Sequence, residues 1–290
     1  MDKITEAMGQ YSLITETEIE LRVSAILADK MAENRNKSVF ETILSCIDLT
    51  SLNTTDTEEG ISLMTEKVNN FEDVYPELPN VAAICIYPSM VNTVHEILTA
   101  GVEIATVTGG FPHSQTFIEV KIAETSLAVM DGATEIDIVF PIGKLLEGKN
   151  EEILEELQEL KTACRDAKLK IILETGALKM EELQRSAILS MESGADFIKT
   201  STGKQLPAAT TTAVMAMCQM IQEYHQKSGR KVGLKVAGGI TSSDDALQYY
   251  CIVESVLGKD WLNKDLLRFG ASKLANNILS DIIGENVTCF

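Results

Sequence analysis

Histidine and closely paired cysteine are scarce in this 290-residue sequence, which contains three histidines and six cysteines. No two cysteines form a CxxC pair, and they stand scattered at Cys46, Cys85, Cys164, Cys218, Cys251 and Cys289. Structural zinc sites draw on closely spaced cysteines and histidines, so this spacing predicts no metal site. Unpaired, reduced cysteines are typical of a reducing compartment, and we therefore expect a cytoplasmic protein.

A long hydrophobic run is also missing. The N-terminal segment "MDKITEAMGQ" has no apolar stretch, which predicts neither a signal peptide nor a membrane span. Basic residues are too few to balance the acidic ones, 25 against 43, so the formal net charge is −18. Nucleic acid and anionic membranes would be repelled by such a chain, and we expect neither as a partner. A small anionic substrate stays compatible, because a local basic pocket can lie within an acidic protein.

What the sequence does contain is a regular alternation of short β-rich runs with longer stretches of helical spacing. The eight runs are "ILSCIDLT" (from Ile43), "VAAICIY" (from Val81), "VEIATVT" (from Val102), "TEIDIVF" (from Thr134), "LKIILET" (from Leu169), "DFIKTST" (from Asp196), "VGLKVAGG" (from Val232) and "LLRFGAS" (from Leu266). Six stretches between them can each hold a helix. Such alternation favours parallel strands with right-handed crossovers.

Eight strand–helix units in about 250 residues predict an α/β protein with a single (β/α)8 TIM barrel. A doubly wound open sheet is the main alternative. We expect residues 1–40 to form an N-terminal helical extension of one or two helices that cap the barrel. Residues 41–284 then form the barrel, and residues 285–290 form a C-terminal tail.

Strand alternation directs charged side chains of three different strands at the barrel interior, and Asp137, Lys199 and Lys235 are the three considered together. In "TEIDIVF" the apolar residues Ile136, Ile138 and Phe140 face the helices, so Glu135 and Asp137 face inward. The same alternation turns Lys199 inward from "DFIKTST", with Phe197 and Ser201, and Lys235 inward from "VGLKVAGG". A structural ion pair is one interpretation of the three charges, and a catalytic site is the other.

The expected lowering of a lysine pKa by a second nearby ammonium and by burial favours catalysis. A free lysine titrates near ~10.4, so its amine is protonated and non-nucleophilic at neutral pH. A second ammonium ~6 Å away, at an effective dielectric constant of ~20, adds about 3 kcal/mol of repulsion, and burial lowers the pKa further. One lysine of the pair can then attack a carbonyl carbon, as Schiff-base catalysis requires.

Taken together, the segments resemble the deoxyribose-phosphate aldolase family. The matching segments are "IDLTSLN", "AAICIYP", "ATVTGGFPH", "GATEIDIVFP", "ILETGALK", "GADFIKTSTGK", "GLKVAGG" and "RFGAS", in family order from about Ile43 to Ser272. The resemblance implies a class I aldolase that needs no metal or other cofactor. It implies reversible cleavage of 2-deoxy-D-ribose 5-phosphate to D-glyceraldehyde 3-phosphate and acetaldehyde, in deoxyribose catabolism.

The resemblance also implies roles for individual residues. Lys199 resembles the Schiff-base nucleophile, Lys235 the group that depresses its pKa, and Asp137 the residue that relays protons with Lys235 and water. The positions that resemble substrate contacts are Asp48, Cys85, Thr202, Lys204, Gly238, Gly239 and Ser272. The expected partners are phosphorylated sugar and aldehyde substrates, and the resemblance allows a homodimer.

Two departures from the family pattern matter. The usual "GASS" is "GASK" here, so Lys273 either strengthens phosphate binding or points outward. The chain ends in Phe290, where some relatives carry a tyrosine proposed to aid proton transfer. Two other functions stay open at this point: another Schiff-base aldolase or transaldolase on the same barrel, and a non-catalytic barrel that binds a phosphosugar.

Overall fold

Eight parallel strands close into a barrel in the computed structural model, which describes residues 9–290. Each strand pairs with the next one along the chain, and β8 pairs with β1. The strands are β1 (Ile47–Thr50), β2 (Ala83–Ile86), β3 (Glu103–Thr108), β4 (Glu135–Val139), β5 (Lys168–Ile172), β6 (Phe197–Lys199), β7 (Gly233–Ala237) and β8 (Leu267–Ala271). The TIM-barrel prediction is therefore confirmed, and the open-sheet alternative is wrong, because the sheet has no free edge.

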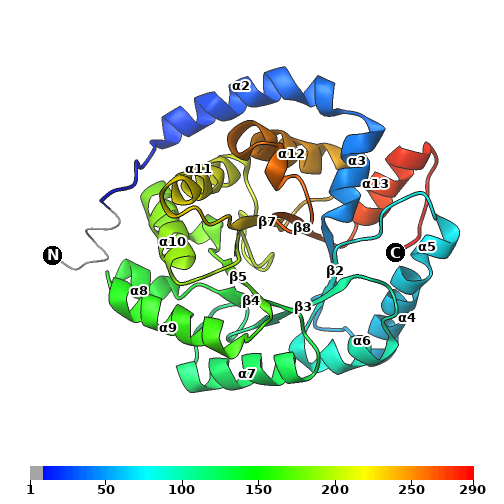
Figure 1. Cartoon of the computed structure of the whole chain (residues 1–290), viewed down its shortest axis with the longest axis horizontal. Helices are drawn as coiled ribbons and strands as arrows, with labels where there is room; N and C mark the ends of the chain where they lie inside the picture. The colour runs from blue at the N-terminus through cyan, green and yellow to red at the C-terminus, as the bar shows by residue number, and fades with distance from the viewer. Residues whose placement is uncertain (1–8) are drawn as a thin grey trace.

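A ring of helices surrounds the barrel (Figure 1). The stretches predicted to be helical contain α4 (Glu58–Asn69), α5 (Phe71–Val74), α7 (Ile118–Met130), α9 (Asn150–Ala163), α10 (Met180–Glu192), α11 (Thr211–Ser228) and α12 (Ser243–Leu257). Helices outside those stretches are α6 (Val91–Ile97), α8 (Ile142–Leu146) and α13 (Leu274–Ile283), with the 3-10 turns η1 (Pro88–Met90), η2 (Thr175–Ala177) and η3 (Lys259–Trp261). Most of these are too short to show a full amphipathic period.

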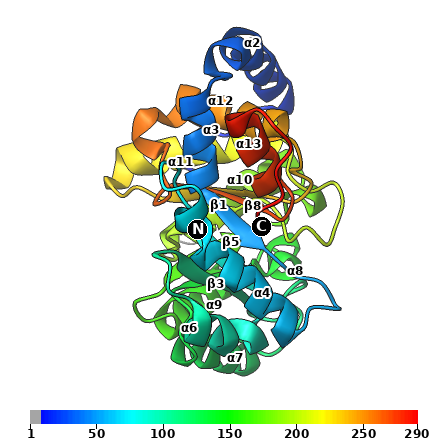
Figure 2. The ribbon, with the colours of Figure 1, turned by 90° about the vertical axis from the view of Figure 1, so that its right-hand side faces the viewer.

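The N-terminal extension lies on the flank of the barrel. Helix α2 (Glu16–Asn34) packs against α11 and α12, and α3 (Lys37–Ser45) packs against α13 and leads into β1. Figure 2 shows α2 as the outermost element on the side of α12. Helix α2 therefore covers the outside of the helix ring, and the division of the chain into extension, barrel and tail stays a prediction. Residues 1–8 of the predicted extension lie outside the described residues.

The outer and inner faces of the barrel sheet carry different kinds of side chain. Their outward side chains, including Ile136, Leu234 and Val236, pack with the helices in one large apolar core. Inside the barrel the apolar part is a small separate cluster of Ala83, Cys85 and Ala105. The interior also holds buried charged side chains, among them Asp137, Lys199 and Lys235, so an apolar core outside the sheet supports charged groups at the barrel centre. Across residues 9–290, no helix is long and apolar enough to cross a membrane.

Candidate active site

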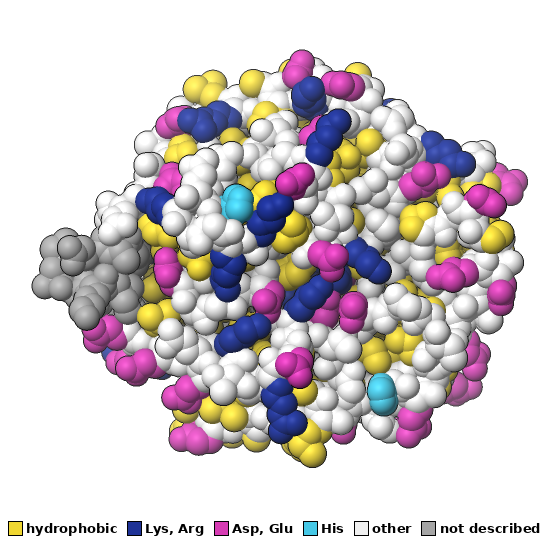
Figure 3. All heavy atoms as spheres, in the orientation of Figure 1, with side chains coloured by type: hydrophobic (Ala, Val, Ile, Leu, Met, Phe, Trp, Pro, Cys, Tyr) yellow, Lys and Arg dark blue, Asp and Glu magenta, His cyan; other side chains and the backbone are white. Residues whose placement is uncertain are grey.

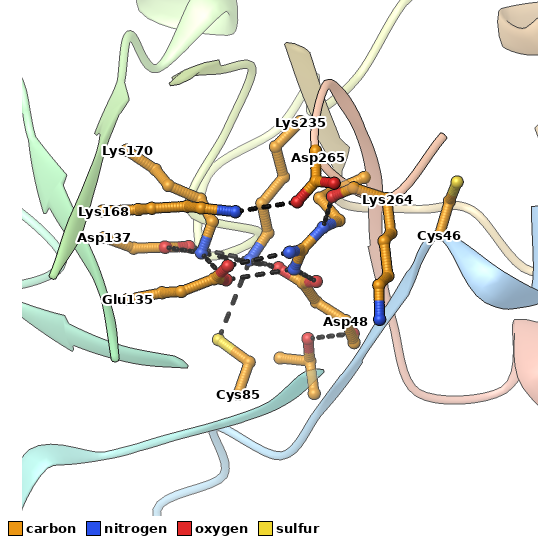
Figure 4. A network of polar contacts seen from close by, with 12 residues as sticks. Cys46, Asp48, Cys85, Glu135, Asp137, Lys168, Lys170, Lys235, Lys264 and Asp265 are labelled. Carbon is orange, nitrogen blue, oxygen red and sulfur yellow. Dashed lines mark hydrogen bonds and ion pairs between the residues drawn. The ribbon is translucent and has the colours of Figure 1, made fainter. Parts of the chain in front are cut away.

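Asp137 stands at the centre of a buried charge network inside the barrel (Figure 4). Its Oδ2 lies 2.8 Å from Lys199 Nζ and 2.8 Å from Lys235 Nζ. Its Oδ1 lies 3.0 Å from Lys170 Nζ. Four neighbouring strands, β4 to β7, supply these four side chains, because alternation turns each of them to the axis. The three charges predicted to share one interior do meet there.

A second tier of ion pairs, formed by Asp48 and Glu135, extends the network. The Arg268 guanidinium spans the two carboxylates, with Nη1 2.6 Å from Asp48 Oδ1 and Nη2 2.7 Å from Glu135 Oε1. Lys235 Nζ lies 2.5 Å from Asp48 Oδ2, and Lys170 Nζ lies 2.5 Å from Glu135 Oε2. Each carboxylate of this tier therefore has a cation on both of its oxygens, as buried charges require.

The charge count of the network is uneven. Four cationic side chains (Lys170, Lys199, Lys235 and Arg268) face three carboxylates (Asp48, Glu135 and Asp137), and all seven are at most 3% exposed. The fully ionised network carries one excess positive charge, which loss of a single proton removes. Lys199 has one carboxylate partner, Asp137, whereas each of the other cations contacts at least two. Lys199 is therefore the group from which the proton leaves most easily.

The directions of the pKa shifts in the network agree with the number of carboxylate partners of each lysine. Burial, together with the Lys235 ammonium, lowers the pKa of Lys199, although Asp137 opposes the change. Burial also disfavours the charged form of Lys235, but Asp137 and Asp48 outweigh it and hold its pKa well above the usual value. Burial alone would raise the pKa of Asp137, but its three lysine neighbours hold it well below the usual range. At neutral pH, Asp137 is thus a carboxylate and Lys235 an ammonium.

A cavity of about 230 Å³ opens above Lys199 at the carboxyl ends of the strands. Its walls come from the ends of β1, β6, β7 and β8 and the loops that follow them, and the lining residues include Thr50, Leu52, Asn53, Thr202, Gly203, Lys204, Gly238, Gly239, Gly270 and Ser272. Active sites of TIM barrels lie at this end. The cavity thus joins a lysine with a lowered pKa to a chamber built from loops.

Three glycines let the backbone line this chamber closely. Gly203, Gly238 and Gly239 have φ values of +77°, +92° and +80°, which side-chain-bearing residues rarely adopt. A Cβ on Gly238 would lie 2.6 Å from the Cβ of Ala208, so a larger residue does not fit there. Left-handed backbone of this kind, close to the N-terminus of α13, presents N–H groups to anions. This part of the cavity lining is therefore suited to a phosphate.

Comparison with known proteins identifies the family. The family model "DeoC/LacD family aldolase" matches residues 42–254. The chain is 38% identical over 244 residues to the deoxyribose-phosphate aldolase of Homo sapiens, covering 80% of this chain and 77% of that one. The bovine (Bos taurus) enzyme of that name is 38% identical over 247 residues, covering 81% and 78%. The chain belongs to the DeoC/LacD aldolase family. It is a lyase.

Solved structures agree with the fold of this aldolase. A structure titled "QR15, an Aldolase" superposes with a TM-score of 0.68 at 27% identity, covering 83% of this chain and 97% of that one. The deoxyribose phosphate aldolase from Aeropyrum pernix, described as a unique tetramer, gives a TM-score of 0.69 at 23% identity, covering 87% and 97%.

The structure sorts the ten predicted site residues of the aldolase into two groups. Six line the cavity: Lys199, Thr202, Lys204, Gly238, Gly239 and Ser272. The other four, Asp48, Cys85, Asp137 and Lys235, lie below them in the barrel. Cys85 is buried, with its Sγ 3.9 Å from Lys235 Nζ, and burial raises the pKa of its thiol. Asp48 and Cys85 thus support the lysines from beneath instead of forming the cavity wall.

Sequence reasoning missed two charged residues of this site, Lys170 and Arg268. Lys170 and Arg268 alternate with apolar neighbours, the same signal that singled out Lys199. Glu174 follows β5 and anchors the cavity loop, because its carboxylate accepts hydrogen bonds from Thr202 Oγ1 at 2.5 Å and from Thr202 N at 3.2 Å. No sequence signal indicates that contact, since it joins loops 28 residues apart.

The two departures from the family pattern lie outside the cavity. Lys273 is exposed at the start of α13 and does not line the chamber. Asn276 Oδ1 accepts hydrogen bonds from the backbone N–H groups of Cys289 and Phe290, at 2.8 and 3.0 Å. The ring of Phe290 stacks on Phe71, with centroids 5.1 Å apart. The C-terminal tail of the aldolase is thus held on α13 and α5.

Proposed function

We propose that this chain cleaves 2-deoxy-D-ribose 5-phosphate reversibly into D-glyceraldehyde 3-phosphate and acetaldehyde, through a Schiff base on Lys199. The observation that carries the proposal is the position of Lys199. It is the cation of the network with a single carboxylate partner, and it lines the cavity. Neutral Lys199 attacks the aldehyde carbon of the open-chain sugar, and loss of water from the carbinolamine gives the iminium ion.

The iminium then serves as an electron sink. A base removes the proton of the C3 hydroxyl, the C2–C3 bond breaks, and its electron pair moves into the enamine on Lys199. Glyceraldehyde 3-phosphate leaves, and the enamine takes a proton at C2 through Asp137, Lys235 and water. Hydrolysis of the resulting iminium releases acetaldehyde and returns the amine. Asp137 suits the relay, because its carboxylate lies 2.8 Å from both lysine nitrogens.

The phosphate binds at the glycine-lined part of the cavity. The left-handed glycines Gly238 and Gly239, the N-terminus of α13 and Ser272 offer hydrogen-bond donors to its oxygens. Lys204 supplies positive charge, and its Nζ contacts the Leu52 carbonyl oxygen across the opening. An uncharged substrate would gain little binding energy from these donors and from Lys204. We therefore expect the phosphorylated sugar to be preferred over 2-deoxyribose.

Borohydride trapping tests the proposal. Incubation with 2-deoxyribose 5-phosphate and borohydride should add the reduced two-carbon or sugar fragment to the peptide that contains Lys199. The Lys199→Met variant should lose trapping and turnover together. Turnover retained in that variant, or a label on another lysine, would overturn the assignment. Product analysis with acetaldehyde and with dihydroxyacetone as donors separates this reaction from that of another Schiff-base aldolase. Thermal stabilisation by the sugar phosphate without turnover would indicate a binding protein instead.

A further inference from the structure

Six of the seven charged side chains of the buried network form a closed ring in which positive and negative charges alternate (Figure 4). Each cation of this charge ring lies within 3.0 Å of the carboxylates on both sides of it, in the order Arg268, Asp48, Lys235, Asp137, Lys170 and Glu135. Three cations and three carboxylates cancel, so the fully ionised ring is neutral by itself.

Lys199 lies outside the charge ring and contacts it at Asp137. Its Nζ is 2.8 Å from Asp137 Oδ2, the same oxygen that lies 2.8 Å from Lys235 Nζ. The ammonium form of Lys199 therefore adds a positive charge that the carboxylates of the network do not balance. The neutral amine leaves the network balanced, and it is also the form that attacks a carbonyl carbon.

The two strands that contribute no member of the network are uncharged at the level of the ring. Ala105 and Val107 of β3 pair in register with the two carboxylate residues of β4, and both are apolar. Cys85 of β2 has an uncharged thiol, because burial raises its pKa. The charges that face Lys199 from the strands are therefore those of the ring.

Two charged side chains from the loops lie near the cavity as well. Lys204 lines it together with Lys199, and Glu174 accepts two hydrogen bonds from Thr202. On the surface, Figure 3 shows acidic and basic side chains scattered among neutral ones. Salt and water screen such exposed charges, whereas buried charges are screened much less. The buried ring therefore has more influence on Lys199 than the acidic surface.

Arg268 closes the ring on the side opposite Asp137. Its guanidinium spans the carboxylates of Asp48 and Glu135, at 2.6 and 2.7 Å, and it is 1% exposed. A guanidinium stays protonated in proteins, so this member of the ring has a fixed charge. We propose that Arg268 is a positioning residue for the aldolase reaction, because its fixed charge completes the ring and thereby keeps Lys199 as the free amine. The catalytic meaning of this role rests on the proposed function.

The strand register places Arg268 close enough to act on Lys199. Lys199 pairs with Lys235 between β6 and β7, and Lys235 pairs with Arg268 between β7 and β8. Two strand spacings amount to about 10 Å. A unit charge at about 10 Å, with an effective dielectric constant of about 20, shifts the pKa of an amine by about one unit. Loss of the Arg268 charge should therefore reduce the neutral fraction of Lys199 about tenfold below its midpoint.

Competitive acetylation measures the protonation of Lys199 without turnover. Each protein is labelled with a trace of acetic anhydride over a range of pH, and peptide mass mapping gives the midpoint of labelling at Lys199. Arg268→Gln should raise this midpoint by about one pH unit, because the ring becomes negative. Glu135→Gln should lower it by a similar amount, because the ring becomes positive. The double variant is neutral again, and its midpoint should return to that of the wild type.

Two further variants separate the charge of Arg268 from a structural role. Arg268→Lys keeps the charge and should keep the midpoint. Lys168→Gln is the matched control, because Lys168 is a strand lysine that is 35% exposed and pairs with Asp265 outside the ring. It should leave the midpoint unchanged. A merely structural Arg268 would lower thermal stability in its variants without these shifts of opposite sign.

Shifts in the same direction in Arg268→Gln and Glu135→Gln, or a double variant that stays shifted, overturn the proposal. If Arg268→Gln does not fold, Glu135→Gln and Arg268→Lys decide the question, because a downward shift in the first and none in the second are required. Circular dichroism and thermal unfolding establish that each variant is folded.

Borohydride trapping with acetaldehyde distinguishes this proposal from the proposed function. An untrapped wild type whose variants show the opposite shifts would refute the aldolase reaction and leave the effect of the ring on Lys199 standing. A wild type trapped at Lys199, with midpoints that do not move in the variants, would refute the role of Arg268 and leave the Schiff base standing.

Discussion

At the scale of single residues, this protein shows how neighbours give three lysines different roles. Lys170, Lys199 and Lys235 all touch Asp137, and all are buried. Two of them have a second carboxylate, and their pKa values are raised in spite of burial, by Asp137 first in both cases. Lys199 lacks a second carboxylate, so burial prevails and its pKa is lowered. The number of carboxylate partners thus separates Lys199 from Lys170 and Lys235.

Replacing Lys235 should change the pH dependence of Schiff-base formation. In Lys235→Met the ammonium that repels Lys199 is gone, so the pKa of Lys199 should rise. The midpoint of the borohydride-trapping rate should then move to higher pH, and each pK unit costs about tenfold in neutral amine below that midpoint. Lys170→Met is the control, because Lys170 pairs with Asp137 and Glu135 and does not touch Lys199. It should move the midpoint less. An unmoved midpoint in Lys235→Met would show that Lys235 has no part in tuning Lys199.

Replacing Lys199 by an uncharged residue should make the protein more stable. The folded state depresses the pKa of Lys199, which means that holding its ammonium there costs free energy. In Lys199→Met this cost disappears, while Asp137 keeps Lys170 and Lys235. We expect the free energy of unfolding at pH 7 to rise, by an amount set by the depression of the Lys199 pKa. The gain is full below the folded-state pKa and shrinks as pH rises through the unfolded value near ~10.4. Urea unfolding at pH 7, 9 and 10 measures it, and a loss of stability at pH 7 would refute the argument.

At the scale of elements, the C-terminal tail links two helices through hydrogen bonds and ring stacking. Asn276 in the first turn of α13 receives two backbone N–H groups of the tail and donates its Nδ2 to the Phe290 carbonyl oxygen at 3.0 Å. The Phe290 ring completes the contact by stacking on Phe71. The tail thus ties α13, whose N-terminus borders the cavity, to α5 on the neighbouring side.

Asn276→Ala should therefore lower stability and leave catalysis intact. The loss of these hydrogen bonds should reduce the free energy of unfolding by about 1–3 kcal/mol. Deletion of Phe290 should act in the same direction, and kcat for sugar phosphate cleavage should stay within twofold in both variants. Thermal unfolding and a coupled assay of glyceraldehyde 3-phosphate release measure the two effects. A tenfold fall in kcat on deletion would mean that the tail reaches the cavity during turnover.

At the scale of the whole molecule, acid is the condition to which the fold is sensitive. The lysines and Arg268 outweigh burial and hold the pKa values of Asp48 and Asp137 below the usual range. Their pairing contributes its full stability above the unfolded-state pKa near ~3.9, and that contribution is lost as pH falls toward the folded-state values.

The cytoplasmic location, which follows from cysteine usage alone, stays a prediction.

Unfolding experiments between pH 7 and pH 2.5 check this prediction. From pH 7 to about pH 5 the network should contribute a constant amount, and below about pH 4 the free energy of unfolding should fall steeply. In Asp137→Asn the acid-dependent part should be smaller, because the central carboxylate is gone. A wild type whose stability does not change down to pH 3 would contradict the role given to the network.

The sequence by itself determined the barrel and the direction of its charged residues. Period-two alternation is local, so eight short runs suffice to predict eight strands and to turn Asp137, Lys199 and Lys235 inward. The motifs then indicated the family and the cavity residues. Each of these inferences needs only the residues within one segment or the order of segments.

Tertiary structure alone decided how those residues meet. Strand register and closure bring Arg268 of β8 against Asp48 and Glu135, and give Lys199 one carboxylate where Lys235 has two. The same holds for Glu174 on Thr202 and for α2 on the flank of the barrel. Contacts between segments far apart in the chain depend on distance and burial in the folded state, and local periodicity carries no information about either.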